Sequence, residues 1–303
     1  MTLDKYKGVI PAFYGCYDDE GAVSAERTRA FTKYLIEKGV HGVYVCGSSG
    51  ECIYQTVEER KLTLENVMAE AKGKITVIAH VACNDIAQSK ELAIHAESLG
   101  VDAIACIPPI YFKLPDSGIA RFWNEISAVA PKTDFIIYNI PQLAGVALSA
   151  SLFGEMLKNP RVIGVKNSSM PVMDIQIFKD MCKDDHVVFN GPDEQFICGL
   201  AMGADGGIGG TYGAMPELYL KMFDLMKNNE VAKAREIQYA VNNIIFAMCS
   251  CKGNMYAIIK EVLRRNGMNI GTVRRPLAHI ENEDEAKIDA CEQMIKDALK
   301  KYA

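Results

Sequence analysis

The sequence lacks several features that mark whole classes of protein. No apolar run approaches the ~18 residues of a membrane-spanning helix, and the charged residues 1–8 contain no apolar signal region. Basic residues form no cluster beyond Arg274-Arg275. These absences argue against a membrane-bound, a secreted or a nucleic-acid-binding protein. We therefore expect a cytoplasmic enzyme or binding protein with no membrane and no nucleic-acid partner.

Metal and disulfide patterns are also missing. None of the ten cysteines forms a C-x-x-C pair, and most lie inside apolar segments, which is typical of reduced core thiols. The Cys249-x-Cys251 pair has the wrong spacing for a zinc hairpin, and none of the five histidines lies near it in sequence. We therefore expect no metal site.

The composition is that of a globular protein with a large core. Apolar residues make up 49% of the 303 residues and charged residues 23%. The net charge of −5 comes from 33 basic and 38 acidic residues, and solubility explains it. The length fits a single α/β barrel, which needs ~250 residues plus additions.

Short β-rich apolar runs alternate with stretches of helical period along most of the chain. Helical stretches cover residues 24–38, 56–71 and 86–99, and another follows Asp116. Eight strands alternating with helices predict a parallel sheet that closes as a (β/α)₈ TIM barrel, with an open doubly wound sheet as the alternative. The eight runs are residues 8–14, 42–46, 76–82, 103–107, 134–139, 162–166, 186–190 and 206–208.

More helix follows the eighth run than a barrel needs. We expect a barrel core over residues 1–215, and over residues 216–303 the last barrel helix and a C-terminal helical extension within the same structural unit. The surplus would cover one side of the barrel or join subunits. The predicted helices are residues 216–227, 231–248, 254–266 and 284–300.

Lys166 and Tyr138 are the leading catalytic candidates, because active sites of such barrels lie at the C-terminal ends of strands. Lys166 ends an apolar run, and burial favours an amine that has lost its proton and is therefore nucleophilic. Tyr138 ends the preceding strand, and sequential strands lie about 4.8 Å apart. The amine can condense with a ketone to an iminium, and the phenol can carry protons. A lysine that reaches solvent and a tyrosine packed in the barrel are the alternatives.

Three other strand ends carry candidate binding groups. The Gly47-Ser48-Ser49-Gly50-Glu51 turn offers backbone N–H groups and two hydroxyls, which suit a carboxylate, although it is also an ordinary Ser/Gly turn. Residues 206–210 lack the dinucleotide fingerprint and the lysine of a P-loop, so we interpret them as a loop that lets a substrate approach the backbone, with tight strand packing as the alternative. Asp193 and Glu194 could bind sugar hydroxyls, although a helix start also favours acidic residues.

These motifs resemble those of the class I pyruvate-dependent aldolases, the family that includes dihydrodipicolinate synthase and N-acetylneuraminate lyase. The resemblance covers residues 8–276 and implies a Schiff-base lysine at Lys166 and a proton-transferring phenol at Tyr138. It implies a cradle for the pyruvate carboxylate at Ser48 and Ser49. The segments that carry it are Gly47-Ser48-Ser49-Gly50-Glu51, Tyr138-Asn139-Ile140-Pro141, Gly164-Val165-Lys166 and residues 203–209.

The resemblance has further implications for the site and the assembly. Tyr44 and Tyr111 match aromatic positions near the active site of the family, and Tyr111 fits a position near a subunit contact. The family is commonly tetrameric, which implies a homotetramer here. The partner it implies is a small 2-keto acid, bound covalently at Lys166 with no separate cofactor.

Within the family, the sequence is more similar to the sialic-acid branch. The synthase branch follows its Tyr-Asn-Val-Pro with Gly-Arg, and that arginine holds a carboxylate of the aldehyde substrate; here residues 142–145 are Gln-Leu-Ala-Gly, without a cation. The lyase branch matches residues 138–141, 190–194 and 206–212. By this resemblance a polyhydroxy tail would meet Gly191, Asp193 and Glu194, and Ser168 is a further substrate-binding candidate.

Two positions depart from the lyase pattern. Gly210 stands where the lyases usually have a serine, and Lys166-Asn167-Ser168 stands where they have Lys-Gln-Thr. The glycine leaves room for a different or larger acceptor. The implied reaction is the cleavage of N-acetylneuraminate to pyruvate and N-acetylmannosamine. Condensation of pyruvate with aspartate semialdehyde, cleavage of another 2-keto-3-deoxy sugar acid, and ligand binding without turnover are the alternatives.

Overall fold

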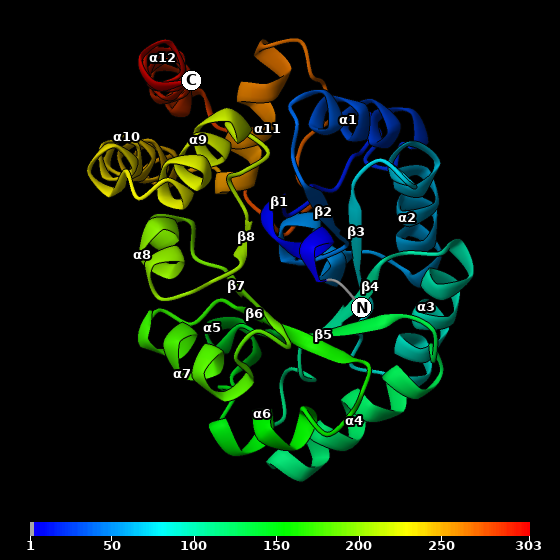
Figure 1. The fold of residues 1–303 in the computed structure, drawn as a ribbon. Helices are drawn as coiled ribbons and strands as arrows, with labels where there is room; N and C mark the ends of the chain where they lie inside the picture. The colour runs from blue at the N-terminus through cyan, green and yellow to red at the C-terminus, as the bar shows by residue number, and fades with distance from the viewer. Residues whose placement is uncertain (1–2) are drawn as a thin grey trace.

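A computed structural model describes residues 3–303 as a TIM barrel, in which eight parallel strands are surrounded by helices (Figure 1). The sheet order is β1-β8-β7-β6-β5-β4-β3-β2, and a parallel bridge between Ala12 and Tyr44 closes the barrel between β1 and β2. All eight predicted strands are present, and because the sheet closes between β1 and β2 the open-sheet alternative is wrong. The strands are β1 (Gly8–Pro11), β2 (Gly42–Val45), β3 (Thr76–His80), β4 (Ala103–Cys106), β5 (Asp134–Asn139), β6 (Val162–Asn167), β7 (Val187–Asn190) and β8 (Gly206–Gly209).

Several helices begin at a residue whose side chain caps the first turn. Thr56 and Glu59 form a capping box at the start of α2, and Asp85 caps α3 by accepting from the Ala87 N–H at 2.8 Å. Helices α5 to α8 were not delimited by the sequence pattern. The helices are α1 (Ala25–Glu37), α2 (Val57–Ala71), α3 (Ile86–Leu99), α4 (Asp116–Ala128), α5 (Pro141–Ala144), α6 (Ala150–Met156), α7 (Met173–Cys182), α8 (Phe196–Ala201), α9 (Pro216–Lys227), α10 (Val231–Cys249), α11 (Met255–Arg265) and α12 (Glu285–Tyr302).

A bulge in β6 sets which of its side chains face the barrel interior. Phe135 pairs with Val162, but the next residue of β5, Ile136, pairs with Gly164, so Ile163 is an extra residue in β6. Ile163 packs in the barrel interior and Val165 in the outer core. If side chains alternated strictly from Ile163, Val165 would face the barrel interior. The extra residue shifts the alternation by one position, so the side chain at position 166 faces the interior instead.

Gly164 is required for this bulge. Its φ of +156° is a conformation that residues with a side chain rarely adopt. A Cβ added at this position would lie 1.8 Å from the Val187 carbonyl oxygen of β7, closer than atoms can approach. The glycine of the Gly164-Val165-Lys166 motif therefore has a backbone role.

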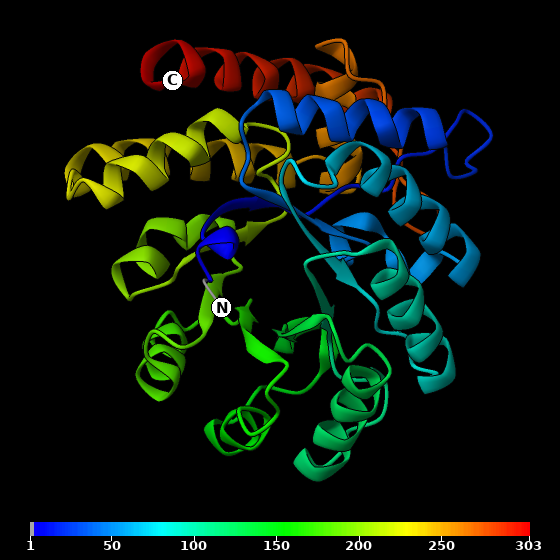
Figure 2. The same cartoon turned by 45° about the vertical axis from the view of Figure 1, so that its right-hand side comes forward.

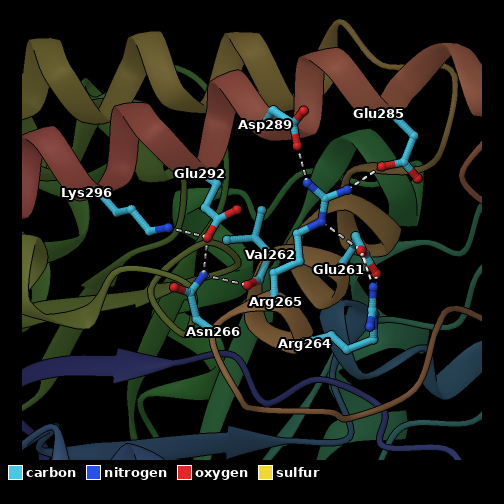
Figure 3. A network of polar contacts seen from close by, with 9 residues as sticks. All are labelled: Glu261, Val262, Arg264, Arg265, Asn266, Glu285, Asp289, Glu292 and Lys296. Atoms are coloured by element: carbon cyan, nitrogen blue, oxygen red, sulfur yellow. Dashed lines mark hydrogen bonds and ion pairs between the residues drawn. The ribbon is translucent and has the colours of Figure 1, made fainter.

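The C-terminal helices α9 to α12 lie together on the side of the barrel where β1 and β8 meet (Figures 1 and 2). A polar network joins α11 to α12 (Figure 3). Arg265 of α11 pairs with Glu285 and Asp289 across the helix interface, and its Nε donates to Glu261 at 2.8 Å. This network holds in place the helix that, as described below, reaches the candidate site.

The Arg265 network predicts a salt-dependent contribution to stability. Replacing Arg265 by methionine should lower the free energy of unfolding by about 1–2 kcal/mol at low ionic strength, because three carboxylates lose a shared cation. In about 1 M salt the difference should shrink, since exposed charges are then screened. Urea unfolding at both salt concentrations measures this. Arg264→Met is the matched control, because Arg264 is more exposed and pairs with Glu261 alone; an equal loss in both variants would contradict the prediction.

Candidate active site

Lys166 and Tyr138 are direct partners in the parallel pairing of β5 and β6, as predicted. The lysine is only 4% exposed, and its Nζ lies 3.9 Å from the centroid of the Tyr138 ring and 4.4 Å from that of Tyr44. Within residues 3–303 no ion pair involves Lys166. The side chain is therefore buried between aromatic faces rather than extended into solvent, so the alternative of a solvent-reaching lysine is wrong.

Tyr44 and His80 complete the aromatic surroundings of the amine. The Tyr44 ring packs edge-on against Tyr138 at 5.6 Å, and the His80 ring does the same at 6.0 Å. The Tyr44 hydroxyl is buried and has no hydrogen-bond partner in the described part of the chain. Because buried hydroxyls normally find a partner, this atom is available to a polar group of a ligand.

His80 is a neutral imidazole that packs beside Tyr138. Burial, followed by the nearby positive charge of Arg60, holds the pKa of His80 well below its usual range. Its Nδ1 lies 3.0 Å from the Cys46 carbonyl oxygen, and the Ile107 N–H lies 3.4 Å from Nε2. The first contact requires Nδ1 to carry the proton. Sequence reasoning did not select His80, although its position at the end of β3 is a signal that could have done so.

The Gly-Ser turn forms a short 3₁₀ helix, Ser48–Gly50, directly after β2. Ser49 is buried and Ser48 is partly buried. The Ser49 Oγ lies 2.8 Å from the hydroxyl of Tyr256, which comes from α11. Tyr256 was not predicted, because only the fold brings residues 49 and 256 together.

A buried ion pair holds the end of this turn. Glu51 has a left-handed backbone with φ of +61°, and its carboxylate accepts from Lys260 Nζ at 2.6 Å and from the Arg274 N–H at 2.7 Å. The side chains of Glu51 and Lys260 are fully buried. Burial lowers the pKa of Lys260, although Glu51 acts in the opposite direction. Because loss of either partner would leave an unpaired buried charge, the pair fixes α11 to the turn.

Helix α11 therefore belongs to the site. The sequence suggested that the extra C-terminal helices would cover the barrel or join subunits. In the structure α11 also supplies Tyr256 and Lys260, which contact Ser49 and Glu51. These residues lie four apart on one helix, so both face the turn.

Asp193 is buried and holds the loop that follows β8. Its carboxylate accepts from the backbone N–H of Gly210 at 3.1 Å and from both the N–H and the hydroxyl of Thr211 at 2.6 Å. Burial raises the pKa of Asp193 to about 6, against the opposing effect of these hydrogen bonds. The neighbouring Glu194 is exposed. Both Asp193 oxygens thus serve the loop, while the Glu194 carboxylate faces solvent.

Ser168 and Gly191 lie against each other at the ends of β6 and β7. A Cβ at Gly191 would lie 2.0 Å from the Ser168 Oγ, so only glycine permits this approach. The Gly191 N–H donates to the Asn167 carbonyl at 2.8 Å, and the Ser168 N–H donates to the Asn139 carbonyl at 2.7 Å. These bonds place the Ser168 hydroxyl at the same end of the barrel as Lys166.

Tyr111 was predicted to lie near the active site, but it is not among the buried rings of Tyr44, Tyr138 and His80. It lies between β4 and α4, is 91% exposed and packs edge-on against Phe112 at 5.0 Å. Its φ of +86° is unusual for a residue with a side chain. In this chain taken by itself, Tyr111 does not contribute to the buried group around Lys166.

Residues 3–303 contain no cluster of three or more side chains suited to hold a metal ion. All ten thiols are free, and Cys198 and Cys249 are exposed rather than part of the core. No helix in the same range combines the length and the apolar character needed to cross a bilayer.

The chain matches one protein family and is similar to several known proteins over nearly its whole length. Residues 5–295 match the dihydrodipicolinate synthetase family. The chain is 63% identical to the N-acetylneuraminate lyase of Mediterraneibacter gnavus over 302 residues, which are 99% of this chain and 96% of that protein. It superimposes on the Ruminococcus gnavus sialic acid aldolase with a TM-score of 0.98 at 63% identity, covering 99% and 100% of the two chains. The Fusobacterium nucleatum N-acetylneuraminate lyase complexed with pyruvate gives 0.90 at 30% identity, covering 98% and 99%.

The buried Asp193 carboxyl predicts a pH dependence of stability. Because burial raises its pKa from the ordinary 3.8 to about 6, the folded protein holds this proton more tightly than the unfolded chain does. The resulting contribution to the free energy of unfolding is fully present below about pH 4 and is lost as the pH rises through about 6, a change on the order of 3 kcal/mol.

Urea unfolding from pH 4 to pH 8 measures this contribution as the difference between the wild type and Asp193→Asn, which cannot titrate. Glu20→Gln is the control, because Glu20 is exposed and lies outside the site, and it should leave the wild-type profile unchanged. Parallel profiles for the wild type and Asp193→Asn would refute the prediction.

Proposed function

The chain belongs to the dihydrodipicolinate synthetase family, and from this we propose that it is a carbon–carbon lyase that reversibly cleaves N-acetylneuraminate to pyruvate and N-acetylmannosamine. The observation that carries the proposal is the buried Lys166 amine, packed on Tyr138 and Tyr44 with no carboxylate partner in the described chain. The names of the similar proteins favour the lyase reaction over the synthase reaction.

Lys166 forms the covalent bond with the 2-keto acid. Its amine attacks the ketone carbon, and loss of water from the carbinolamine leaves an iminium between the lysine and the substrate. The bond that breaks lies one carbon beyond the iminium carbon; its electron pair moves toward the iminium to form an enamine, and the aldehyde leaves. Protonation of the enamine carbon and hydrolysis of the resulting iminium then release pyruvate and restore the amine. Tyr138 carries protons to and from the carbinolamine and the oxygen that becomes the aldehyde. The reaction therefore uses a covalent Schiff base and no separate cofactor.

The turn after β2 receives the carboxylate of the keto acid. Ser48 and Ser49 supply hydroxyls, and the 3₁₀ turn presents N–H groups near the same end of the barrel. The buried Tyr44 hydroxyl, which has no protein partner among residues 3–303, adds a polar atom beside the amine. This arrangement suits pyruvate, the small anion that one solved relative carries.

The opposite part of the site receives the sugar chain. Ser168, Gly191 and Glu194 present a hydroxyl, a bare backbone and an exposed carboxylate at the ends of β6 and β7. Asp193 acts on this region by fixing the Gly210 and Thr211 N–H groups. The segment 142–145 contains no cation, so a carboxylate on the aldehyde, as in aspartate semialdehyde, finds no partner there.

Borohydride trapping tests the lysine directly. With pyruvate present, reduction should attach a reduced pyruvyl group to Lys166, detected by peptide mass spectrometry. Lys260 serves as an internal control, because it is also buried but bonded to Glu51 and should stay unmodified. An unmodified Lys166 would contradict the Schiff-base mechanism.

The same preparation should then cleave N-acetylneuraminate faster than it cleaves 2-keto-3-deoxygluconate or condenses aspartate semialdehyde with pyruvate. Trapping at Lys166 without cleavage of N-acetylneuraminate would leave the mechanism intact and reject this substrate.

The assembly is also part of the proposal: a homotetramer in the cytoplasm, by resemblance to the family. The exposed Tyr111 and Phe112 pair supports a subunit contact, because large aromatic side chains are rarely this exposed without a partner. Light scattering should give a mass near that of four 33.4 kDa chains. Tyr111→Asp should shift the mass downward, whereas Tyr239→Asp, on an exposed part of α10, should not. A monomeric wild type would refute the tetramer.

A further inference from the structure

Gly210 and Tyr256 meet at a point where the structure has no room for a side chain. A Cβ built on Gly210 would lie 2.8 Å from the Tyr256 hydroxyl oxygen and 3.3 Å from the Ser49 Oγ. The first distance is shorter than real Cβ contacts, so a side chain at position 210 requires Tyr256 to move. The next ring atom of Tyr256, Cε1, is 3.6 Å away, which is an ordinary contact. The severe conflict is therefore with the Tyr256 hydroxyl, and the contact with the Ser49 Oγ is also tighter than usual.

The backbone of Gly210 does not itself demand glycine. Its φ lies outside the left-handed region, so an alanine would fit the local conformation. The segment is fixed on both sides, because the Gly210 N–H donates to Asp193 at 3.1 Å and its carbonyl accepts from the buried Tyr14 hydroxyl at 2.7 Å. The loop cannot retreat from Tyr256 without breaking these bonds.

Tyr256 is held as firmly from the other side. Its N–H donates to Asn254, the capping residue of α11, at 3.0 Å. One turn later, Lys260 ties the same helix to Glu51 through the buried ion pair. The Tyr256 hydroxyl in turn bonds the Ser49 Oγ at 2.8 Å. A displacement of the Tyr256 phenol therefore breaks this bond or moves the Ser49 hydroxyl with it.

We propose that Tyr256 is a positioning residue for Ser49 and that Gly210 is glycine in this chain because the Tyr256 hydroxyl occupies the space beside it. The inference rests on the proposed function, in which Ser49 binds the carboxylate of the 2-keto acid. The pair links the two halves of the site: a change on the sugar side, at position 210, alters binding on the keto-acid side, at Ser49. Neither residue touches the reacting carbon atoms in this account.

A double-mutant cycle tests the link with Gly210→Ala, Tyr256→Phe and the double variant. The readout is the pyruvate concentration that gives half-maximal borohydride trapping at Lys166, together with KM for pyruvate and kcat in the synthetic direction. Gly210→Ala should raise the half-saturating concentration about tenfold, because the methyl group displaces the phenol and with it Ser49. Tyr256→Phe should raise it about threefold through the lost hydrogen bond.

The two effects should not add. In the Tyr256→Phe background the methyl group no longer meets the hydroxyl and keeps only the milder 3.3 Å contact with the Ser49 Oγ, so Gly210→Ala should add a factor below about two. In all variants kcat should stay within about twofold of the wild type, because a positioning residue for the carboxylate cradle acts on binding. An equal factor for Gly210→Ala in both backgrounds, or a loss of kcat with unchanged half-saturation, would overturn the inference.

Matched controls separate this link from general effects of the substitutions. Gly154→Ala places a Cβ in the middle of α6 at 3.5 Å from Met181, and Tyr239→Phe removes an exposed hydroxyl from α10; both should leave half-saturation unchanged. Thermal unfolding confirms that each variant is folded. No trapping in the wild type would reject the proposed function, whereas trapping with additive effects would reject the link alone.

Discussion

One extra residue in β6 decides which side chains of that strand enter the barrel. Because Ile163 is inserted opposite the Phe135–Ile136 step of β5, the side chain at position 166 points inward at the same level as Tyr138. Gly164 makes the bulge possible by letting the Val187 carbonyl approach. Without this irregularity the inward position would belong to Val165, and the amine would lie in the outer core among the helices. The chemistry of the site thus depends on a local defect in sheet pairing.

Two buried lysines in this barrel show how surroundings decide the role of a side chain. Lys260 donates to Glu51 and to the Thr272 carbonyl, so its charge is matched by a carboxylate and it ties two distant segments together. Lys166 lies on aromatic faces instead, and within residues 3–303 no carboxylate pairs with it. A matched charge suits a structural tie, whereas an amine without a counter-ion suits covalent chemistry.

Much of the fold and part of the site could be predicted from the sequence, because those features are local or depend on neighbouring strands. The eight strands and the pairing of Tyr138 with Lys166 are of this kind. The bulge could not be predicted, since it appears only when β5 and β6 are paired. The contacts of Ser49 with Tyr256 and of Glu51 with Lys260 join residues about two hundred positions apart, and no sequence period connects them.

Helix α11 also makes the site depend on the order in which the chain is synthesised. The turn that would bind the keto acid ends at Glu51, and the proposed nucleophile Lys166 follows, but the helix that holds the turn begins at Met255. A growing chain therefore carries both proposed reacting groups, Tyr138 and Lys166, long before it carries the support for the proposed carboxylate cradle. Completion of the site is deferred to the last part of the polypeptide, so that an incomplete chain has the nucleophile without a formed place to bind its substrate.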